Sequence, residues 1–99
     1  MLTPKQKAYL KSLAQTKKAA FQIGKEGLSA NLRDDVLNYL NKHEIIKISI
    51  LKNSETTFEE AIAYFSLSDI EFVQKIGHVL VLYKHSDTID NPIVLPEKK

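Results

Sequence analysis

The sequence predicts an α/β fold, a two-layer sandwich of helices on a four-stranded mixed sheet. Segments with apolar residues at helical spacing alternate with segments of period two, in the order helix-strand-helix-strand-helix-strand-strand. Strands separated by helices favour parallel pairing, whereas the last two strands, joined by a tight turn, favour an antiparallel pair. A length of 99 residues suits one domain with a modest core.

The first expected helix has a well-defined start. Thr3 suits the N-cap, Pro4 the first helical position, and Gln6 completes a capping box. An apolar stripe at helical spacing then covers residues 9–14. The chain continues into a short predicted strand over residues 19–23.

The middle of the chain predicts a second helix and strand. Ser29 is a good N-cap for a helix that reaches about His43. Over residues 44–51, isoleucines alternate with Lys47 and Ser49, which predicts a strand. Because one face of that strand is apolar and the other mixed, we expect a sheet covered on one side only.

The third helix has two possible starts, a capping box of Thr56 with Glu59 or of Thr57 with Glu60. Two strands are expected after it, joined at Gly77 by a hairpin turn. We therefore expect a domain over residues 1–85 and an irregular tail over 86–99. The residues predicted to line the buried side of the sheet are Phe21, Ile23, Ile46, Ile48, Ile50, Phe72, Ile76, Leu80 and Leu82.

The glycine loop, Gly24-Lys25-Glu26-Gly27, holds two of the three glycines in the chain. Glycine tolerates positive φ and lacks a Cβ, so this spacing lets another backbone approach closely. The free N–H groups at the start of the following helix attract phosphate. The same spacing also serves as an ordinary strand-to-helix turn.

Positive charge is concentrated near the amino terminus, although the formal net charge is only +2. Six lysines precede the first acidic residue, Glu26. This asymmetry indicates a basic face for an anionic partner. We expect one continuous positive surface from the first helix to the glycine loop, formed by Lys7, Lys11, Lys18 and Lys25.

The residues give little support to an enzyme. The glycine loop lacks the Walker pattern, and three scattered histidines lack metal-ligand spacing. His43 is expected on the apolar side of its helix. We therefore expect no cofactor, no metal and no small-molecule substrate. The absence of cysteine, of a signal peptide and of a membrane-spanning run favours a cytoplasmic protein.

Aromatic residues offer little surface for stacking bases. The four phenylalanines fall in apolar patterns and are expected in the core. For Tyr9 and Tyr83 we favour packing at the edge of the core over base stacking. The sequence thus favours a protein that binds nucleic-acid backbone and shape over one that reads single-stranded sequence.

Four short segments carry a resemblance to a known family. They are Leu2-Thr3-Pro4-Lys5-Gln6-Lys7, Phe21-Gln22-Ile23-Gly24-Lys25-Glu26-Gly27-Leu28, His43-Glu44-Ile45-Ile46-Lys47-Ile48, and Val73-Gln74-Lys75-Ile76-Gly77 followed by Val81-Leu82-Tyr83-Lys84. In these the chain resembles the CRM (chloroplast RNA splicing and ribosome maturation) domain family, in its bacterial single-domain, YhbY-like branch. A weaker echo follows at residues 93–96.

The resemblance implies a fold related to the C-terminal domain of translation initiation factor three. It also implies RNA contact through Gly24, Lys25, Glu26 and Gly27, with weaker basic support from Lys47, and association with precursors of the large ribosomal subunit. Together, residues and resemblance predict a monomeric cytoplasmic RNA-binding protein of ribosome assembly. A protein–protein adaptor on assembly intermediates is the alternative, and charge alone does not separate RNA from DNA.

Overall fold

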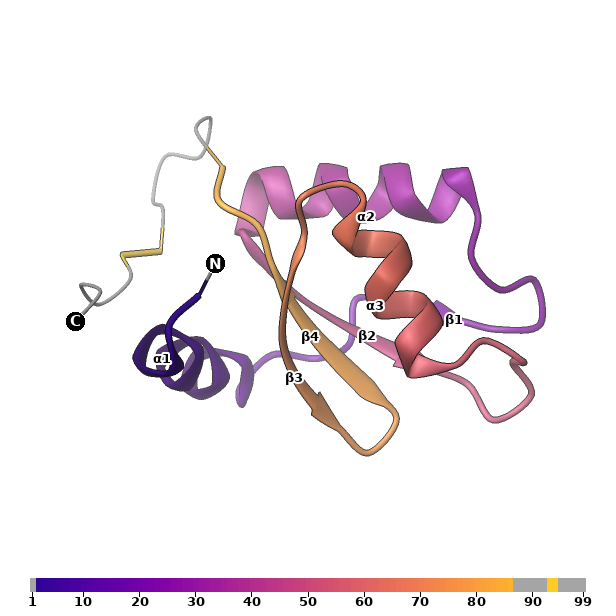
Figure 1. Cartoon of the computed structure of the whole chain (residues 1–99), viewed down its shortest axis with the longest axis horizontal. Helices are drawn as coiled ribbons and strands as arrows, with labels where there is room; N and C mark the ends of the chain where they lie inside the picture. Colours follow the sequence, from indigo (N-terminus) through magenta and orange to yellow (C-terminus); the bar gives the residue numbers. More distant parts are fainter. Residues whose placement is uncertain (1, 87–92, 95–99) are drawn as a thin grey trace.

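The computed structural model describes residues 2–86 and 93–94 and confirms the predicted fold class (Figure 1). Three helices and a four-stranded mixed sheet occur in the predicted order. Their bounds are α1 Pro4–Ala14, β1 Phe21–Ile23, α2 Ala30–His43, β2 Ile45–Ile50, α3 Phe58–Ser66, β3 Glu71–Ile76 and β4 Val79–Tyr83. The expected irregular tail covers residues 86–99. Of these, the structure describes only residues 86, 93 and 94, and the others lie outside the described residues.

Helix starts follow the predicted capping chemistry. In α1 the Thr3 side chain accepts the N–H of Gln6, and the Gln6 side chain accepts the N–H of Thr3. Thr57 and Glu60 make the same reciprocal pair at α3, so the second of the two predicted starts is correct. Each pair satisfies two backbone N–H groups that the helix itself leaves without acceptors.

The sheet has the strand order β1-β2-β4-β3. β1 runs parallel to β2, with Phe21 opposite Ile48, whereas β4 is antiparallel to both β2 and β3. β1 and β3 are therefore the two edge strands. This mixed pattern follows from the crossover through α2 and from the short hairpin between β3 and β4.

The larger core lies between the sheet and the helices α2 and α3. Its centre is formed by Leu40 of α2, Phe65 of α3 and Ile48 of β2, all fully buried. These two layers are the predicted sandwich. Phe21 and Phe72 are only partly buried at its margin.

The other face of the sheet is also covered at one end, where α1 packs on it. Leu10 and Ala14 of α1 form a second core with Ile45, Val73 and Tyr83. The expectation of a sheet covered on one side only is therefore wrong at this end. The physical reason lies in β4, whose last four residues, 80–83, are buried on both faces and need apolar cover on each.

Ile76 is the predicted core residue that the structure places elsewhere, since 48% of its surface is exposed. A register shift between Phe72 and Gln74 interrupts the alternation of β3. One additional residue reverses the faces of all later side chains, so Lys75 takes the face expected of Ile76. There its Nζ lies 4.2 Å from the centre of the Phe58 ring.

Within residues 2–86 and 93–94, the helices are too short and too polar to cross a bilayer.

Candidate functional site

The glycine loop connects β1 to α2 through a tight turn. The N–H of Gly27 donates to the carbonyl of Gly24 at 3.0 Å. Gly27 has φ +68°, in the left-handed region that only glycine adopts without steric cost. Gly24 has no such backbone requirement, so its lack of a side chain is not explained by the turn.

Two other connections lie at the same end of the sheet as the glycine loop. The N–H of Leu51 donates to the carbonyl of Ile23 at 2.9 Å, and the N–H of Ile50 to the carbonyl of His78 at 2.7 Å. A Cβ built on Gly27 would lie 3.1 Å from Oγ1 of Thr56. Three segments thus meet at one end of the sheet, which we call the loop end: residues 24–27, 51–56 and 77–78.

The amino terminus of α2 opens directly beside the loop end. Ser29 caps it, and its Oγ accepts the N–H of Leu32 at 3.1 Å. The first two helical residues, Ala30 and Asn31, have no acceptor within the helix for their N–H groups. Such free N–H groups attract an anion, and the positive end of the helix dipole strengthens this attraction.

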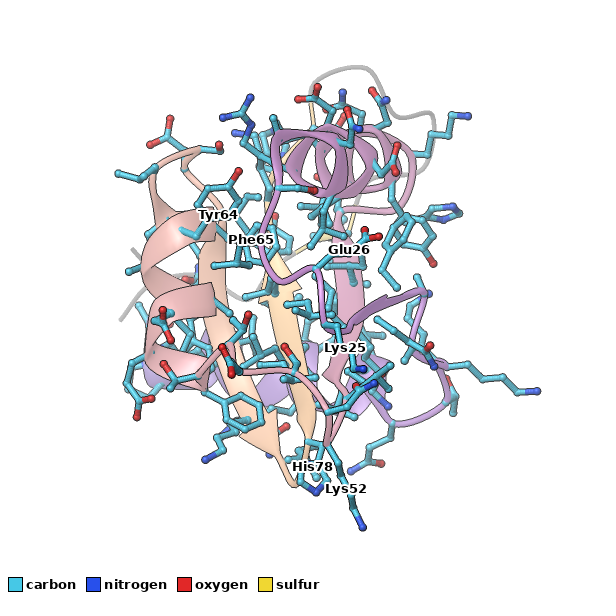
Figure 2. The ribbon with its side chains drawn as sticks, turned by 90° about the vertical axis from the view of Figure 1, so that its right-hand side faces the viewer. Lys25, Glu26, Lys52, Tyr64, Phe65 and His78 are labelled. Atoms are coloured by element: carbon cyan, nitrogen blue, oxygen red, sulfur yellow. The ribbon has the colours of Figure 1, made fainter. Side chains whose placement is uncertain are left out.

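Charged side chains at the loop end are exposed and of both signs. Figure 2 shows Lys25 on the side of Lys52 and His78, and Glu26 on the side of α2. The two neighbouring side chains therefore leave the loop in different directions. A phosphate beside Lys25 and Lys52 would not have to meet the Glu26 carboxylate.

The lysines of α1 do not lie at the loop end. Lys7 lines a hollow with Asp69 and Glu71 near the start of β3, whereas the glycine loop follows β1 at the opposite sheet edge. Figure 1 shows α1 and the glycine loop at opposite ends of the view. The predicted continuous positive surface from Lys7 and Lys11 to Lys25 is therefore wrong, because helical spacing within α1 does not determine where α1 docks.

The two remaining predicted lysines lie on the side of α1. Lys18 precedes β1 and Lys25 follows it, so an extended strand, at about 3.3 Å per residue, separates them. Nζ of Lys47 donates to the carbonyl of Lys17 at 2.9 Å and so holds the linker from α1 to β1. Lys7 and Lys11 belong to α1 itself, and Lys18 and Lys47 lie on its side of the molecule. We call these four residues the α1 lysines.

Residues 2–84 match the model of the CRS1 / YhbY (CRM) domain. The chain belongs to this family. A Bacillus subtilis (strain 168) protein named "Probable RNA-binding protein YqeI" is 40% identical over 87 residues, which cover 87% of this chain and 91% of that relative. An "RNA-binding protein" of Haemophilus influenzae is 36% identical over 98 residues, covering 98% of this chain and 97% of that protein.

A solved structure supports the same assignment. The solution structure of a hypothetical Staphylococcus aureus protein, described as a candidate RNA-binding protein, superimposes with a TM-score of 0.73 at 37% identity. The match covers 97% of this chain and 100% of that one. The CRM domain described here therefore shares its whole fold with that protein.

A second feature of this CRM domain was not identified from the sequence. Tyr39 packs edge-on against Phe21, with ring centres 5.9 Å apart, and lies 4.3 Å from the ring of His43 at a tilt of 36°. His43 is exposed, but its ring packs on Tyr39, which contacts the core, so His43 lies at the margin of the apolar side of α2. The helical spacing of Tyr39 and His43 was the available signal, but their pairing with an edge strand was not visible in the sequence.

Glu44 is a second residue whose role is not visible in the sequence pattern. It ends α2 with φ +63°, and its carboxylate is fully buried. The carboxylate accepts the N–H of Ser86 at 2.8 Å and the N–H of Ile93 at 2.6 Å, and it lies 3.0 Å from Nδ1 of His85. Glu44 thus ties the chain that follows β4 to the end of α2.

Tyr83 is buried beside α1, which confirms the preference for packing over stacking at this position. Burial raises its pKa to about 12, with further contributions from the negative charges of Glu44 and Glu71. Tyr9, in contrast, is 38% exposed on α1. Among residues 2–86 and 93–94, no three His, Cys, Asp or Glu side chains are grouped so that they could hold a metal ion.

Proposed function

We propose that this protein binds RNA, and that the loop end is where the sugar–phosphate backbone docks. The proposal rests first on family membership, together with relatives that are named RNA-binding proteins. The single structural observation that supports it best is the glycine loop, closed by Gly27 at φ +68° directly before the amino terminus of α2. Such a loop leaves backbone N–H groups accessible to a phosphate.

The mechanism combines attraction with close approach. Lys25 and Lys52 neutralise phosphates at the loop end, and each phosphate contact releases counterions from the RNA. Gly24 and Gly27 present no side chain, so the RNA backbone reaches the N–H groups of Ala30 and Asn31. Glu26 lies on the side of α2. In this mechanism its carboxylate accepts hydrogen bonds from a base or a ribose hydroxyl.

The α1 lysines act as a second, separate electrostatic surface. Because α1 packs at the other end of the sheet, they reach only an RNA that is large enough to contact both ends. This arrangement favours a folded RNA over a short strand. We therefore propose structured ribosomal RNA of the large-subunit precursor as the partner, bound by a cytoplasmic monomer that is not an enzyme.

Binding titrations at several salt concentrations test this function. Fragments of large-subunit ribosomal RNA should bind with a logarithmic salt slope of about −0.7 to −0.9 for each phosphate contacted. Competition with DNA of the same sequence tests whether the ribose hydroxyl contributes. Salt-insensitive binding, or no binding, to every fragment would contradict the proposal.

The alternative is an adaptor that binds a ribosomal or assembly protein. Ile76 and Leu51 expose 48% and 37% of their surfaces near the loop end, where α1 does not cover the sheet. An apolar interface there would depend little on salt. Loss of ribosome association on Ile76→Glu, with RNA affinity unchanged, would favour the adaptor.

A further inference from the structure

A hollow of about 490 Å³ lies between the edge strand β1 and one side of α2. We call it the β1–α2 hollow. It is lined by Phe21, Asp35, Asn38, Tyr39, Lys42 and His43. The five α2 residues recur at intervals of three and four, so they form one continuous stripe along the helix.

We propose that the β1–α2 hollow binds an unpaired nucleobase of the same RNA strand that docks at the loop end. This inference rests on the proposed RNA-binding function and assigns it a base-recognition site. The hollow and the glycine loop are built on the same two elements, because β1 ends at Ile23 and α2 begins at Ala30. A strand leaving the loop can therefore follow α2 to the hollow.

The aromatic rings provide the stacking surface. His43 is exposed and lies over Tyr39, which is held in turn by the edge of the Phe21 ring. Tyr39 and Phe21 are packed against the core, so these two rings are ordered before a base arrives. An aromatic surface that is already ordered costs little side-chain entropy on binding. Bases splayed out of an RNA strand stack on such rings.

The polar side chains favour a base over a phosphate within the hollow. The exposed carboxylate of Asp35 repels phosphate but accepts hydrogen bonds from an amino group, as acidic side chains do with cytosine N4. Asn38 can both donate and accept. Lys42 is the cation of the set and suits the phosphate of the same nucleotide. The chemistry therefore matches a base with an exocyclic amino group and disfavours uracil.

The distance between the two sites fits a short strand. Ala30 and Tyr39 are nine positions apart on α2, about 14 Å at 1.5 Å per residue. That distance corresponds to roughly four stacked nucleotides at about 3.4 Å each. β1 is an edge strand, so one side of its backbone remains available beside the hollow.

The test compares RNA with bases and RNA without them. Two probes of about ten nucleotides are titrated by fluorescence anisotropy: oligo(A), and the same strand with abasic sites at its central positions. Base–aromatic stacking contributes about 1–3 kcal/mol per base, so the wild type should prefer oligo(A) about fivefold to more than a hundredfold. His43→Ala and Tyr39→Leu should lose most of this preference, and His43→Phe should keep it.

Further variants separate recognition of a base from other effects. Oligo(U) should bind more weakly than oligo(A), and Asp35→Asn should reduce this difference. Tyr9→Leu, which removes an exposed aromatic ring from α1, is the matched control and should change nothing. Because His43 is an exposed surface residue, His43→Ala should remain folded even if Tyr39→Leu does not.

The possible failures are distinguishable. If both probes bind with the same salt-dependent affinity, or if His43→Ala keeps the full preference, the base site is overturned and the RNA-binding function stands. If no RNA binds at any salt concentration, both proposals are overturned. Self-association that depends on protein concentration and is abolished by His43→Ala, with no base preference, would assign the hollow to a second copy of the chain instead.

Discussion

A hydrogen bond of 2.6 Å joins the buried carboxylate of Glu44 to the backbone N–H of Ile93, 49 positions further along the chain. The same carboxylate accepts the N–H of Ser86, whose hydroxyl donates to the carbonyl of Asn41 at 2.8 Å. One acidic side chain thus connects the end of α2 to two later segments. Buried charge is tolerated here because backbone donors satisfy it.

Replacing Glu44 should show how much this connection stabilises the fold. Glu44→Ala leaves the N–H groups of Ser86 and Ile93 without their acceptor, and each unsatisfied buried donor costs about 1–3 kcal/mol. We expect urea denaturation to show a loss of that order in the free energy of unfolding. A loss below about 0.5 kcal/mol, the usual range for surface substitutions, would show that the tail contacts do not contribute.

Glu44→Gly separates the backbone from the side chain at the same position. Glycine also removes the carboxylate but adopts φ +63° without the steric cost of about 1 kcal/mol. It should therefore be more stable than Glu44→Ala by roughly that amount. Equal stabilities would mean that the left-handed conformation of this residue is not strained.

The two glycines of the loop should respond differently to alanine. A Cβ on Gly24 would lie 3.6 Å from Cδ1 of Leu51, an ordinary contact, so Gly24→Ala should melt at or slightly above the wild-type temperature. Its RNA affinity should nevertheless fall, because the new methyl group lies in the loop where we propose that the RNA backbone docks. Wild-type RNA affinity in the folded variant would mean that Gly24 serves no ligand.

Gly27 serves both the turn and the proposed RNA contact. Its variants separate the effect on stability from the effect on RNA affinity. Because φ is +68°, any side chain should lower stability by roughly 1 kcal/mol, asparagine least. Gly27→Asp also adds a negative charge to the proposed phosphate site. RNA affinity should therefore fall in the order wild type, Gly27→Asn, Gly27→Asp, measured on variants that thermal melts show to be folded. An aspartate variant as tight as the wild type would favour the adaptor.

The α1 lysines lie far from Lys25 at the loop end. We therefore expect the contribution of each group to RNA binding to depend on the length of the RNA. With an RNA of about ten nucleotides, Lys25→Ala should lower the salt slope by about one unit, whereas Lys11→Ala should leave it unchanged. With a folded ribosomal fragment, both substitutions should weaken binding. Their effects should be additive, since sites far apart rarely couple. A Lys11→Ala effect on the short RNA equal to that of Lys25→Ala would contradict the arrangement.

The raised pKa of Tyr83 predicts that the folded protein loses stability at alkaline pH. Burial, aided by Glu44 and Glu71, raises its pKa from 10.0 to about 12, so the folded protein holds the phenol proton more tightly than the unfolded chain. The resulting stabilisation is complete below pH 10 and is lost as the pH rises through 12. The stability of Tyr83→Phe relative to the wild type should rise over that interval, as measured by urea denaturation. A constant difference would mean that Tyr83 ionises alike in both states.

Most of the fold could be predicted from sequence because its signals are local. The capping box of Thr3 and Gln6 and the alternating isoleucines of β2 act within a few residues, and the structure contains both as predicted. The glycine loop was equally visible, since glycine is the residue that adopts φ +68° at position 27 without steric cost. Local periodicity also assigned Ile48 and Leu82 correctly to the core.

Other features were decided only by tertiary structure, because they depend on which surfaces meet. The docking of α1 on the second face of the sheet separates Lys7 from Lys25, although both lie in the same lysine-rich stretch of sequence. A single register shift in β3 exchanged the sheet faces of the Ile76 and Lys75 side chains, and no local pattern specifies where such a shift falls. The burial of Glu44 and the pairing of Tyr39 with Phe21 arise from contacts between distant segments, which residue spacing along one element does not encode.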